Sequence, residues 1–374
     1  MLMSTSLLIL APSRRGATET FIRDSVESLP FKVNAYFGDE YLSFDFLCLL
    51  YGASVLLSKF LTRLGLLRLA SIPSSVAAGL LIFKYRPDVV MVEFGFHAVR
   101  VMEVARLEVP LLVQFHGADA SADRYLIKLR ERYRRLMKLA SGVIVKNNSM
   151  REKLIALGAL PEKLTISPSC PKEEIFTGSN PQESPPHFLA VGRFVPKKSP
   201  LDTLEAFARM RFFSDRYHSA TLEMIGGGPL FEVVKRKVFE LKLENVVSLP
   251  GVLTPLKVVE SMRKARAFVQ HSRRALDGDE EGCPVSVIEA QLCGLPVIST
   301  FHGGIPDVVL HRQTGILVEE GDTLAMAVAM AELFDNPILA AKLGASGQIR
   351  SRKNFTLDCH IKQIASLIQH LSLT

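Results

Sequence analysis

The chain has 374 residues, which is long for one hydrophobic core and suits two domains, and its 48% hydrophobic, 22% charged composition argues against global disorder. Its formal net charge of +7 favours an anionic partner, which could be membrane lipid, nucleic acid or a phosphorylated substrate. The five cysteines form no C-x-x-C pair, so the sequence predicts reduced thiols in a cytoplasmic compartment and argues against a disulfide framework or a structural zinc site.

Short apolar runs alternate with helical patterns from the N-terminus, which is typical of parallel α/β architecture. Residues 7–11 form the first predicted strand, and the apolar N-terminus has no basic n-region and is too short to span a bilayer. The loop that follows, residues 12–20, contains Gly16 and Thr18. Loops at the carboxyl ends of strands line the ligand crevice of a doubly wound sheet, so both residues are candidate ligand contacts; a solvated loop is the alternative.

Residues 44–69 combine long apolar runs with Lys59, Arg63 and Arg68 at helical spacings. One interpretation is a helix pair packed on the sheet. The other is a helix that lies in the plane of a membrane surface and extends its basic groups to the headgroups. A transmembrane span is disfavoured, because these basic residues would sit inside the bilayer.

Two further predicted strands, residues 89–93 and 111–115, end in polar residues. Glu93, His116 and Asp119 therefore belong at the strand ends, where this architecture places its chemistry. The helical pattern at residues 123–140 is strongly basic, which suggests attraction to anionic lipid headgroups. Nucleic acid is disfavoured, since the sequence has no zinc-finger spacing, RNP-like pattern or basic–aromatic stacking platform.

Predicted strands at residues 142–145 and 164–166 complete the first domain. A Pro- and Ser-rich stretch follows and reads as a linker. We therefore predict an N-terminal domain over residues 1–178, a linker over 179–186, and a C-terminal domain over 187–355.

The second domain restarts the alternation with a strand at residues 188–191. Arg193 and Lys198 flank the turn after this strand, where two cations can clamp a diphosphate. The glycines at residues 226–228 follow the next strand, but they lack the spacing of a dinucleotide fingerprint or a Walker motif. A tight turn is the favoured interpretation of these glycines.

An acidic loop at residues 277–283 runs into Pro284 and an apolar helical pattern. Proline is favoured at the start of a helix, so backbone N–H groups and the positive end of the helix dipole are expected at residues 282–286 and could seat a phosphate. Glu281 and Glu289 would then lie on either side of that phosphate. The alternative is an ordinary helix start with solvated acids.

Several motifs together resemble the retaining glycosyltransferases of family 4, which have the GT-B fold. Glu281 and Glu289 match the E-x7-E signature, and Gly192-Arg193 followed by Lys198 looks like G-R-x4-K. Residues 225–230 look like I-G-x-G-P-L, residues 303–307 resemble G-G-x-x-E/D, and residues 116–119 resemble H-G-x-D. The chain departs from the pattern at Ser199, where the family usually has glycine.

The resemblance implies two Rossmann-like domains facing each other across a cleft, with the C-terminal helix, residues 356–374, packing back toward the N-terminal, acceptor domain. Arg193 and Lys198 would hold the donor diphosphate, together with Gly282, Cys283 and Pro284. Glu289 would bind the ribose. Catalysis would involve His116 and Glu281, while Gly16, Thr18, Glu93 and Asp119 are possible acceptor or sugar contacts. The family usually needs no divalent cation, so no metal or other cofactor is expected.

The resemblance thus predicts a retaining, metal-independent hexosyltransferase. It would move a sugar from a nucleotide-diphosphate sugar, UDP- or GDP-linked, to a lipid-linked or polysaccharide acceptor in cell-envelope or exopolysaccharide biosynthesis. The basic amphipathic stretches predict a cytoplasmic protein, peripheral on the inner face of the cell membrane, with anionic membrane as a partner and no nucleic acid. The alternatives are a nucleotide-sugar epimerase or hydrolase of the same fold, and a non-catalytic basic membrane-binding module.

Overall fold

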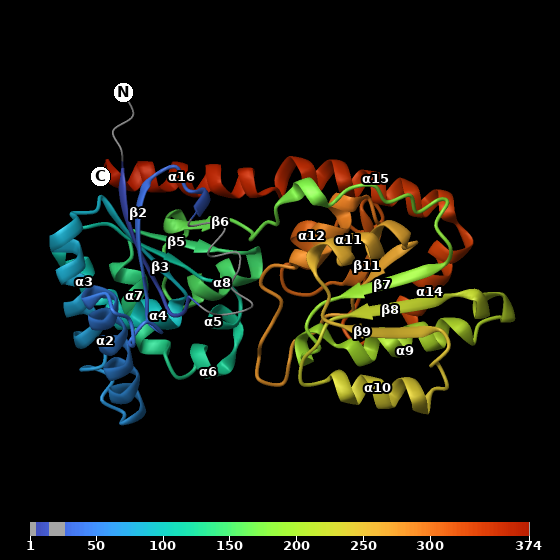
Figure 1. Ribbon diagram of the computed structural model, residues 1–374, viewed down its shortest axis with the longest axis horizontal. Coiled ribbons are helices and arrows are strands. Elements are labelled where there is room, and N and C mark those ends of the chain that lie inside the picture. Colours follow the sequence, from blue (N-terminus) through green and yellow to red (C-terminus); the bar gives the residue numbers. More distant parts are fainter. Residues whose placement is uncertain (1–4, 15–26, 374) are drawn as a thin grey trace. The chain divides into compact units, whose positions relative to one another are not determined.

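The computed structural model describes residues 5–14 and 27–373 and divides into two compact units (Figure 1). Unit 1 takes its residues from Met1–Pro168 and His360–Thr374, and unit 2 is Ser169–Cys359. Each unit is built on a six-stranded sheet whose paired strands run parallel. The predicted α/β class is confirmed. Gly16 and Thr18 lie outside the described residues.

The sheet of unit 1 has the strand order β2-β1-β3-β4-β5-β6. Its strands are β1 (Ser6–Ala11), β2 (Lys32–Phe37), β3 (Val89–Glu93), β4 (Leu111–Gln114), β5 (Gly142–Val145) and β6 (Leu164–Ile166). Its helices are α2 (Phe46–Arg63), α3 (Ile72–Tyr85), α4 (Gly95–Val101), α5 (Ala118–Ser121), α6 (Asp123–Leu126), α7 (Arg130–Leu139) and α8 (Asn148–Ala156), joined by most of α16 (Leu357–Ser372).

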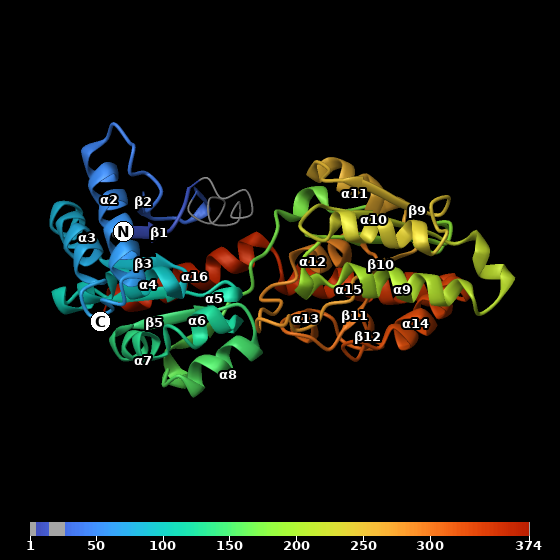
Figure 2. The ribbon, with the colours of Figure 1, turned by 90° about the horizontal axis from the view of Figure 1, so that it is seen from below.

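The sheet of unit 2 has the order β12-β11-β10-β7-β8-β9. Its strands are β7 (His187–Val191), β8 (Thr221–Ile225), β9 (Val247–Gly251), β10 (Ala267–Val269), β11 (Val297–Thr300) and β12 (Gly315–Val318). Helices cover both faces of this sheet (Figures 1 and 2). They are α9 (Pro200–Arg211), α10 (Phe231–Glu240), α11 (Pro255–Lys264), α12 (Val285–Cys293), α13 (Ile305–Val308), α14 (Thr323–Asp335) and α15 (Pro337–Asn354).

The strands are buried because they are almost continuously apolar, as expected for parallel sheets covered on both faces. All described residues of β3, β4 and β5 are buried, and so are those of β10, β11 and β12. The sheet therefore forms a rigid layer from which the loops at the strand ends project, and those loops carry the polar residues considered below.

The boundary between the units lies earlier than the predicted linker. Unit 2 begins at Ser169, and residues 179–186 pack within it. The Ser179 N–H donates to the Cys293 carbonyl over 3.1 Å, and the buried Arg266 guanidinium donates to the Ser184 carbonyl. The Pro and Ser content of this stretch reflects close turns against unit 2 and not a free tether.

The predicted basic helix over residues 123–140 is wrong in its continuity. The structure has two helices, α6 and α7, separated at residues 127–129. Nothing in the local sequence marks the break, because residues 127–129 are Ile, Lys and Leu, all compatible with a helix. Strand β2 was not predicted from the sequence, although residues 32–37 contain β-favouring Val, Tyr and Phe.

Among the described residues, α2 is the one helix that is by itself long and apolar enough to cross a membrane, by length and composition only. Helices α14, α15 and α16 pass the same test only as a bent pair of segments, Thr323–Asp335 and Pro337–Ser372. These helices carry extensive buried apolar faces. Core helices of globular proteins pass such a test, so composition alone does not decide whether α2 meets a membrane.

Candidate active site

The polar loops of unit 2 converge where its strand order reverses. Strand β7 pairs with β8 on one side and with β10 on the other, so the chain moves away from β7 in both directions. In open α/β sheets the ligand crevice opens at the carboxyl ends of the strands at such a switch point. The loop after β7 carries Arg193 and Lys198, and the segment after β10 carries Glu281. The topology therefore brings these three residues to one edge of the sheet.

Lys198 and Glu281 form a shielded ion pair at this edge. The Lys198 amino group contacts the Glu281 carboxylate directly and lies 3.4 Å from the Gln270 side-chain oxygen. Only 15% of the lysine side chain and 6% of the glutamate side chain are exposed. Burial by itself would raise the pKa of Glu281, but Lys198 and Lys197 outweigh it and leave that pKa lowered. Glu281 is therefore held as a carboxylate.

Lys197 fixes the acidic loop that leads to Glu281. Its amino group donates to the Asp279 carboxylate and to the Glu280 carbonyl, each over 3.1 Å. The Glu280 carboxylate instead lies 3.7 Å from the Arg274 guanidinium. The neighbouring acids Glu280 and Glu281 thus have different partners, and Glu281 is the one that meets Lys198, in agreement with the spacing to Glu289.

Arg193 is exposed and lines a small pocket together with Lys198 and Gln270. The backbone around Arg193 is fixed by the glycine loop after β8. A side chain at Gly226 would place its Cβ 1.9 Å from the Gly192 carbonyl oxygen, and one at Gly228 would come 2.7 Å from that of Phe194. These glycines permit close backbone packing, which supports the tight-turn interpretation over a phosphate loop.

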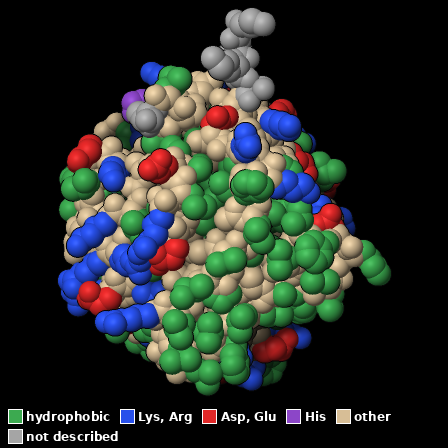
Figure 3. All heavy atoms as spheres, turned by 90° about the vertical axis from the view of Figure 1, so that its left-hand side faces the viewer, with side chains coloured by type: hydrophobic (Ala, Val, Ile, Leu, Met, Phe, Trp, Pro, Cys, Tyr) green, Lys and Arg blue, Asp and Glu red, His purple; other side chains and the backbone are tan. Residues whose placement is uncertain are grey.

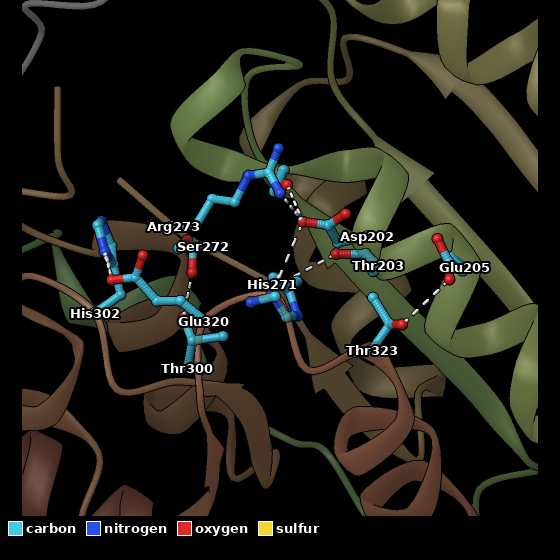
Figure 4. Close-up of polar contacts among 12 residues, drawn as sticks. Asp202, Thr203, Glu205, His271, Ser272, Arg273, Thr300, His302, Glu320 and Thr323 are labelled. Carbon is cyan, nitrogen blue, oxygen red and sulfur yellow. Dashed lines mark hydrogen bonds and ion pairs between the residues drawn. The ribbon is translucent and has the colours of Figure 1, made fainter. Parts of the chain in front are cut away.

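His302 holds the backbone of Glu281 from behind. The Glu281 N–H donates to His302 Nε2 over 3.0 Å, and His302 Nδ1 lies 2.6 Å from Glu320. Since Nε2 accepts a hydrogen bond, the imidazole proton sits on Nδ1 and is donated to Glu320. Figure 4 shows the His302 ring directed at Glu320. A side chain at Gly303 would come 2.4 Å from the Glu281 carbonyl oxygen, which explains the glycine beside this histidine.

His302 and Glu320 were not among the predicted site residues. The histidine stands directly before the two glycines of residues 303–304, which was the available signal. Its role depends on a contact between residues 21 positions apart, and the sequence does not display that contact.

A second network of polar contacts fixes the start of α9, directly after the loop that carries Arg193 and Lys198 (Figure 4). Asp202 accepts a hydrogen bond from Ser199 over 2.5 Å and lies 3.3 Å from the Arg273 guanidinium. Ser199 has φ of 37°, in the left-handed region that favours glycine. The substitution of serine for the family's glycine therefore places strain beside Lys198, and the Ser199 hydroxyl offsets part of it by bonding Asp202.

The helix start at α12 differs slightly from the prediction. Pro284 is the residue before the helix and not its first residue, because its ψ of 69° is not helical. Gly282 and Pro284 are buried, Cys283 is half-buried, and the Cys283 thiol donates to the Ser169 carbonyl over 3.0 Å. The Ser286 hydroxyl lies 3.3 Å from Gln270. The start of α12 is thus joined to the Lys198 group through Gln270.

Glu289 lies in the second turn of α12 and is half-buried. Burial raises the pKa of Glu289 to about 7, an effect that Lys198 only partly opposes. A carboxyl group with so high a pKa is poised to accept hydrogen bonds that stabilise its ionised form. Near neutral pH Glu281 is therefore ionised, whereas Glu289 is only partly ionised.

In unit 1, the predicted residues Glu93, His116 and Asp119 lie together at the ends of β3 and β4. His116 Nε2 is hydrogen-bonded to Glu93 over 2.6 Å, and both side chains are almost fully buried. Asp119 is buried too, and its carboxylate accepts backbone N–H bonds from Gly95, His116 and Gly117, each of 2.9 Å. The Asp119 carboxylate is thus engaged in holding the loop.

In the part of the chain that the structure describes, no group of three or more His, Cys, Asp or Glu side chains could hold a metal ion. The chemistry available at unit 2 is anion binding. Arg193, Lys198 and the start of α12 supply positive potential for phosphate groups. Glu281 and Glu289 supply acceptors for hydroxyl groups near them.

Two family descriptions match the chain. Residues 171–350 match "Glycosyl transferases group 1", and residues 51–170 match "Glycosyltransferase Family 4". The two matched ranges adjoin each other. Residues 171–350 include the whole Arg193, Lys198, Glu281 and Glu289 set, whereas Glu93, His116 and Asp119 fall within residues 51–170.

The chain is similar to several named glycosyltransferases, among them the following two. The chain is 28% identical to the amylovoran biosynthesis glycosyltransferase AmsK of Erwinia amylovora, over 77% of this chain and 71% of AmsK. It is 29% identical to a GDP-mannose-dependent alpha-(1-6)-phosphatidylinositol monomannoside mannosyltransferase of Mycolicibacterium smegmatis, over 49% of this chain and 47% of that protein.

A solved structure shares the whole fold. Alr3699/HepE of Anabaena, crystallised in complex with UDP, superposes with a TM-score of 0.75 at 16% identity, over 98% of this chain and 100% of HepE. At that identity the likeness establishes the fold and does not extend to the ligand.

Proposed function

Because the chain belongs to glycosyltransferase family 4, with the GT-B fold, we propose that it transfers a sugar from a nucleotide-diphosphate sugar with retention of configuration. Glycosyltransferase activity in exopolysaccharide or glycolipid biosynthesis follows from the family matches and the named relatives. The observation that carries the finer proposal is the ion pair between Lys198 and Glu281 beside the exposed Arg193, at the switch point of the unit 2 sheet.

The donor would bind with its diphosphate against Arg193, Lys198 and the start of α12. Arginine can contact a phosphate through two parallel N–H bonds, and lysine acts as a point charge. The Glu281 carboxylate would accept hydroxyl groups of the transferred sugar, with the backbone of Gly282, Cys283 and Pro284 beside it. Glu289 would accept the ribose hydroxyls, and those bonds would favour its ionised form.

Transfer with retention requires departure of the nucleoside diphosphate and arrival of the acceptor on the same face of the sugar. The leaving phosphate can take the acceptor proton, so no dedicated base is needed. Arg193 and Lys198 would stabilise the charge that develops on the leaving diphosphate. We propose that these two residues take the part that a divalent cation plays in other transferases. Activity should therefore persist when divalent cations are removed with EDTA. His116, held by Glu93, stays our prediction for a further contact with the sugar.

The donor and the acceptor are proposed from relatives. HepE was crystallised with UDP and with UDP-glucose, and the mycobacterial relative is named as GDP-mannose-dependent. We therefore propose a UDP- or GDP-sugar donor and a lipid-linked or polysaccharide acceptor. The sequence has five cysteines and no C-x-x-C pair, which suits our proposed location on the cytoplasmic side of the cell membrane.

The test is replacement of Arg193 by alanine and by lysine. Arg193→Ala should lower the transfer rate by roughly 10²–10³, the usual loss when one charge-stabilising donor is removed. Arg193→Lys should recover part of that rate, because it restores charge but not bidentate geometry. The matched control is Arg236→Ala, which removes an exposed arginine from α10. Full activity in Arg193→Ala, with a panel of UDP- and GDP-sugars, would refute the assignment.

A further inference from the structure

Helices α2 and α3 of unit 1 pack side by side, as Figures 1 and 2 both show. The seam between them and the rest of unit 1 contains small and hydroxylic residues. Ser58 and Ser74 are fully buried, and their hydroxyls are 2.7 Å apart. Ala77 and Ala78 of α3 and Gly52 of α2 are buried as well. The buried side of this helix pair therefore combines these small residues with Tyr51, Val55, Leu81 and Ile82.

Many of the large apolar side chains of the same helices point outward. They recur at helical spacings on both helices, and they continue through the connection between α2 and α3. We call this set the α2–α3 face; its exposed members are Phe46, Leu49, Leu56, Leu57, Phe60, Leu64, Leu66, Leu67, Leu69, Ile72, Val76, Leu80 and Phe83. Figure 3 shows the resulting hydrophobic area, which is broad and continuous over this end of unit 1.

This distribution is the reverse of that in a helix pair facing water. A surface helix of a globular protein buries its apolar stripe and exposes polar residues, whereas Phe60 is 56% exposed and Phe83 is 78% exposed. Contiguous exposed apolar patches of such extent mark interaction surfaces. Small residues between helices and large apolar residues outside are the arrangement found where helices meet lipid.

The charges on the α2–α3 face are of one sign. Between Phe46 and Tyr85 the sequence has no Asp or Glu, and its basic residues are Lys59, Arg63, Arg68 and Lys84. Arg63, Arg68 and Lys84 are exposed, while Lys59 is half-buried. On the nearby helix α7, the residues Arg130, Arg134, Arg135 and Lys138 are exposed, and two of them pair with Glu131 and Glu103. In Figure 3, Lys and Arg side chains gather beside the hydrophobic area.

The connection between the helices is suited to an apolar environment. Several of its backbone N–H groups are bonded within the connection and to the end of α2: Leu64 donates to Phe60, Leu66 to Leu61, and Ala70 to Leu66. Backbone groups that enter hydrocarbon must be paired in this way. Meanwhile Tyr51 and Val55 are fully buried in unit 1, and the Tyr51 hydroxyl bonds His97 over 2.7 Å. Helix α2 is therefore part of the folded unit and is not free to span a bilayer.

We propose that the α2–α3 face is a membrane-docking surface, which places its Leu and Phe side chains at the acyl border of an anionic bilayer. Arg63, Arg68 and Lys84 extend to lipid phosphates, each contributing attraction that falls with salt. A second copy of the chain is a poorer occupant, because two such faces would oppose their basic residues with no acid in this segment to pair them. Docking is independent of donor binding, which we assign to unit 2.

The absence of tryptophan from the chain permits a direct test on the full-length protein. Phe60→Trp and Phe83→Trp place single reporters on the α2–α3 face, and Phe212→Trp places one on an exposed position of unit 2. Each variant is mixed with vesicles of phosphatidylglycerol and phosphatidylethanolamine whose acyl chains carry bromine, a tryptophan quencher. Leu64→Trp replaces Phe83→Trp should that variant not fold, as judged by circular dichroism.

The expected result is a blue shift and strong quenching of Phe60→Trp and Phe83→Trp, and neither in Phe212→Trp. Vesicles of phosphatidylcholine alone should bind at least about tenfold more weakly, because the basic residues lose their partners. Arg63→Gln combined with Arg68→Gln should reduce the salt dependence of binding. Quenching that is absent, or equal in all three reporters, overturns the proposal. So does a blue shift without vesicles accompanied by sedimentation as a dimer, which would assign the face to a second copy.

Nucleotide binding by unit 2, measured by calorimetry on the same variants, separates docking from transfer. A protein that docks but transfers no sugar would refute only the proposed function. A protein that transfers sugar to a soluble acceptor but shows no quenching would refute only the docking surface.

Discussion

Acidic residues that follow the strands have different kinds of partner in the two units. In unit 1 the Asp119 carboxylate is consumed by three backbone N–H groups, and Glu93 is paired with His116. In unit 2 the Glu281 carboxylate contacts Lys198, which also lies near the Gln270 oxygen, and burial raises the pKa of Glu289 to about 7. Backbone N–H groups thus hold Asp119, whereas Glu281 is held by a lysine side chain.

The difference teaches that an acid at the carboxyl end of a strand is not by itself a site. Backbone N–H groups satisfy Asp119 locally, whereas Glu281 depends on a side-chain cation that arrives from the loop after a different strand. Substitution of Asp119 should therefore act on stability, and substitution of Glu281 on activity. The predictions below separate these two outcomes.

The largest effect is expected at Glu281. Glu281→Gln removes the charge that Lys198 neutralises and the strongest acceptor for the sugar, so transfer should fall by roughly 10²–10³. The matched control is Glu280→Gln, whose carboxylate lies 3.7 Å from Arg274 and should be dispensable within a few-fold. Initial rates with the best donor measure both. Equal losses in the two variants would mean that Glu281 has no special role.

Asp119→Asn should destabilise unit 1 and leave nucleotide binding intact. The amide oxygen can keep the bonds from His116 and Gly117, but the amide nitrogen would then oppose the Gly95 N–H. Loss of a charged acceptor with one buried donor left unpaired costs about 2–3 kcal/mol. Urea unfolding followed by circular dichroism measures the loss, and calorimetry measures nucleotide affinity. Unchanged stability would contradict the positioning role of Asp119.

Glu289 should make unfolding depend on pH in a predictable direction. Its folded pKa is raised to about 7 from the usual 4.5, so the folded protein holds a proton that the unfolded chain releases. The contribution of the group to stability is therefore lost as pH rises from about 4.5 to 7. Glu289→Gln should raise the melting temperature at about pH 8 relative to wild type, corresponding to about 1–3 kcal/mol, and much less at about pH 5.

The protonation of Glu289 can also be followed through nucleotide binding. If ribose hydroxyls bond the Glu289 carboxylate, donor binding near neutral pH should release protons, and Glu289→Gln should abolish that release. Calorimetry in buffers of different ionisation enthalpy detects the protons. Proton release that persists in the glutamine variant would assign the ribose to another group.

The smallest effect is expected at Ser199. Its hydroxyl donates a hydrogen bond to Asp202, a carboxylate of unit 2 that holds the start of α9. Ser199→Ala keeps the left-handed backbone and removes the bond to Asp202, whereas Ser199→Gly removes both the bond and the strain. The glycine variant should therefore be more stable than the alanine variant by about 1 kcal/mol. Thermal unfolding compares them, and equal melting temperatures would show that φ at residue 199 carries little strain.

Much of the fold was predictable because buried parallel strands are apolar runs of limited length. The predicted bounds of β3, β5 and β6 match the structure, although residues 123–140 do not form one helix. That break has no Gly or Pro, so local propensity could not reveal it, and packing of the surrounding elements decides where α7 begins. The two units followed from chain length, but their boundary required the contacts of residues 179–186.

The contact between Lys198 and Glu281 could be expected from the motif spacing, and their role with Glu289 in donor binding stays a prediction. The contact of His302 with the Glu281 backbone could not be expected, because it joins segments distant in sequence. The α2–α3 face could be predicted only in part. Periodicity indicated amphipathic helices, but the sequence could not show that serines and alanines would be among the buried residues. Polar partners such as Ser58 and Ser74 become recognisable only once the helices are paired.

The order in which the units can mature follows from the placement of α16. Unit 1 takes Ile361, Ile364 and Ile368 from this helix as buried residues, and Ser167 bonds His360 over 2.7 Å. Unit 2 is contiguous in the chain, from Ser169 to Cys359, and lies between the two parts of unit 1. During synthesis unit 2 can therefore complete its core first, while helices α2 and α3 belong to a unit that needs the last residues of the chain before its sheet is fully covered.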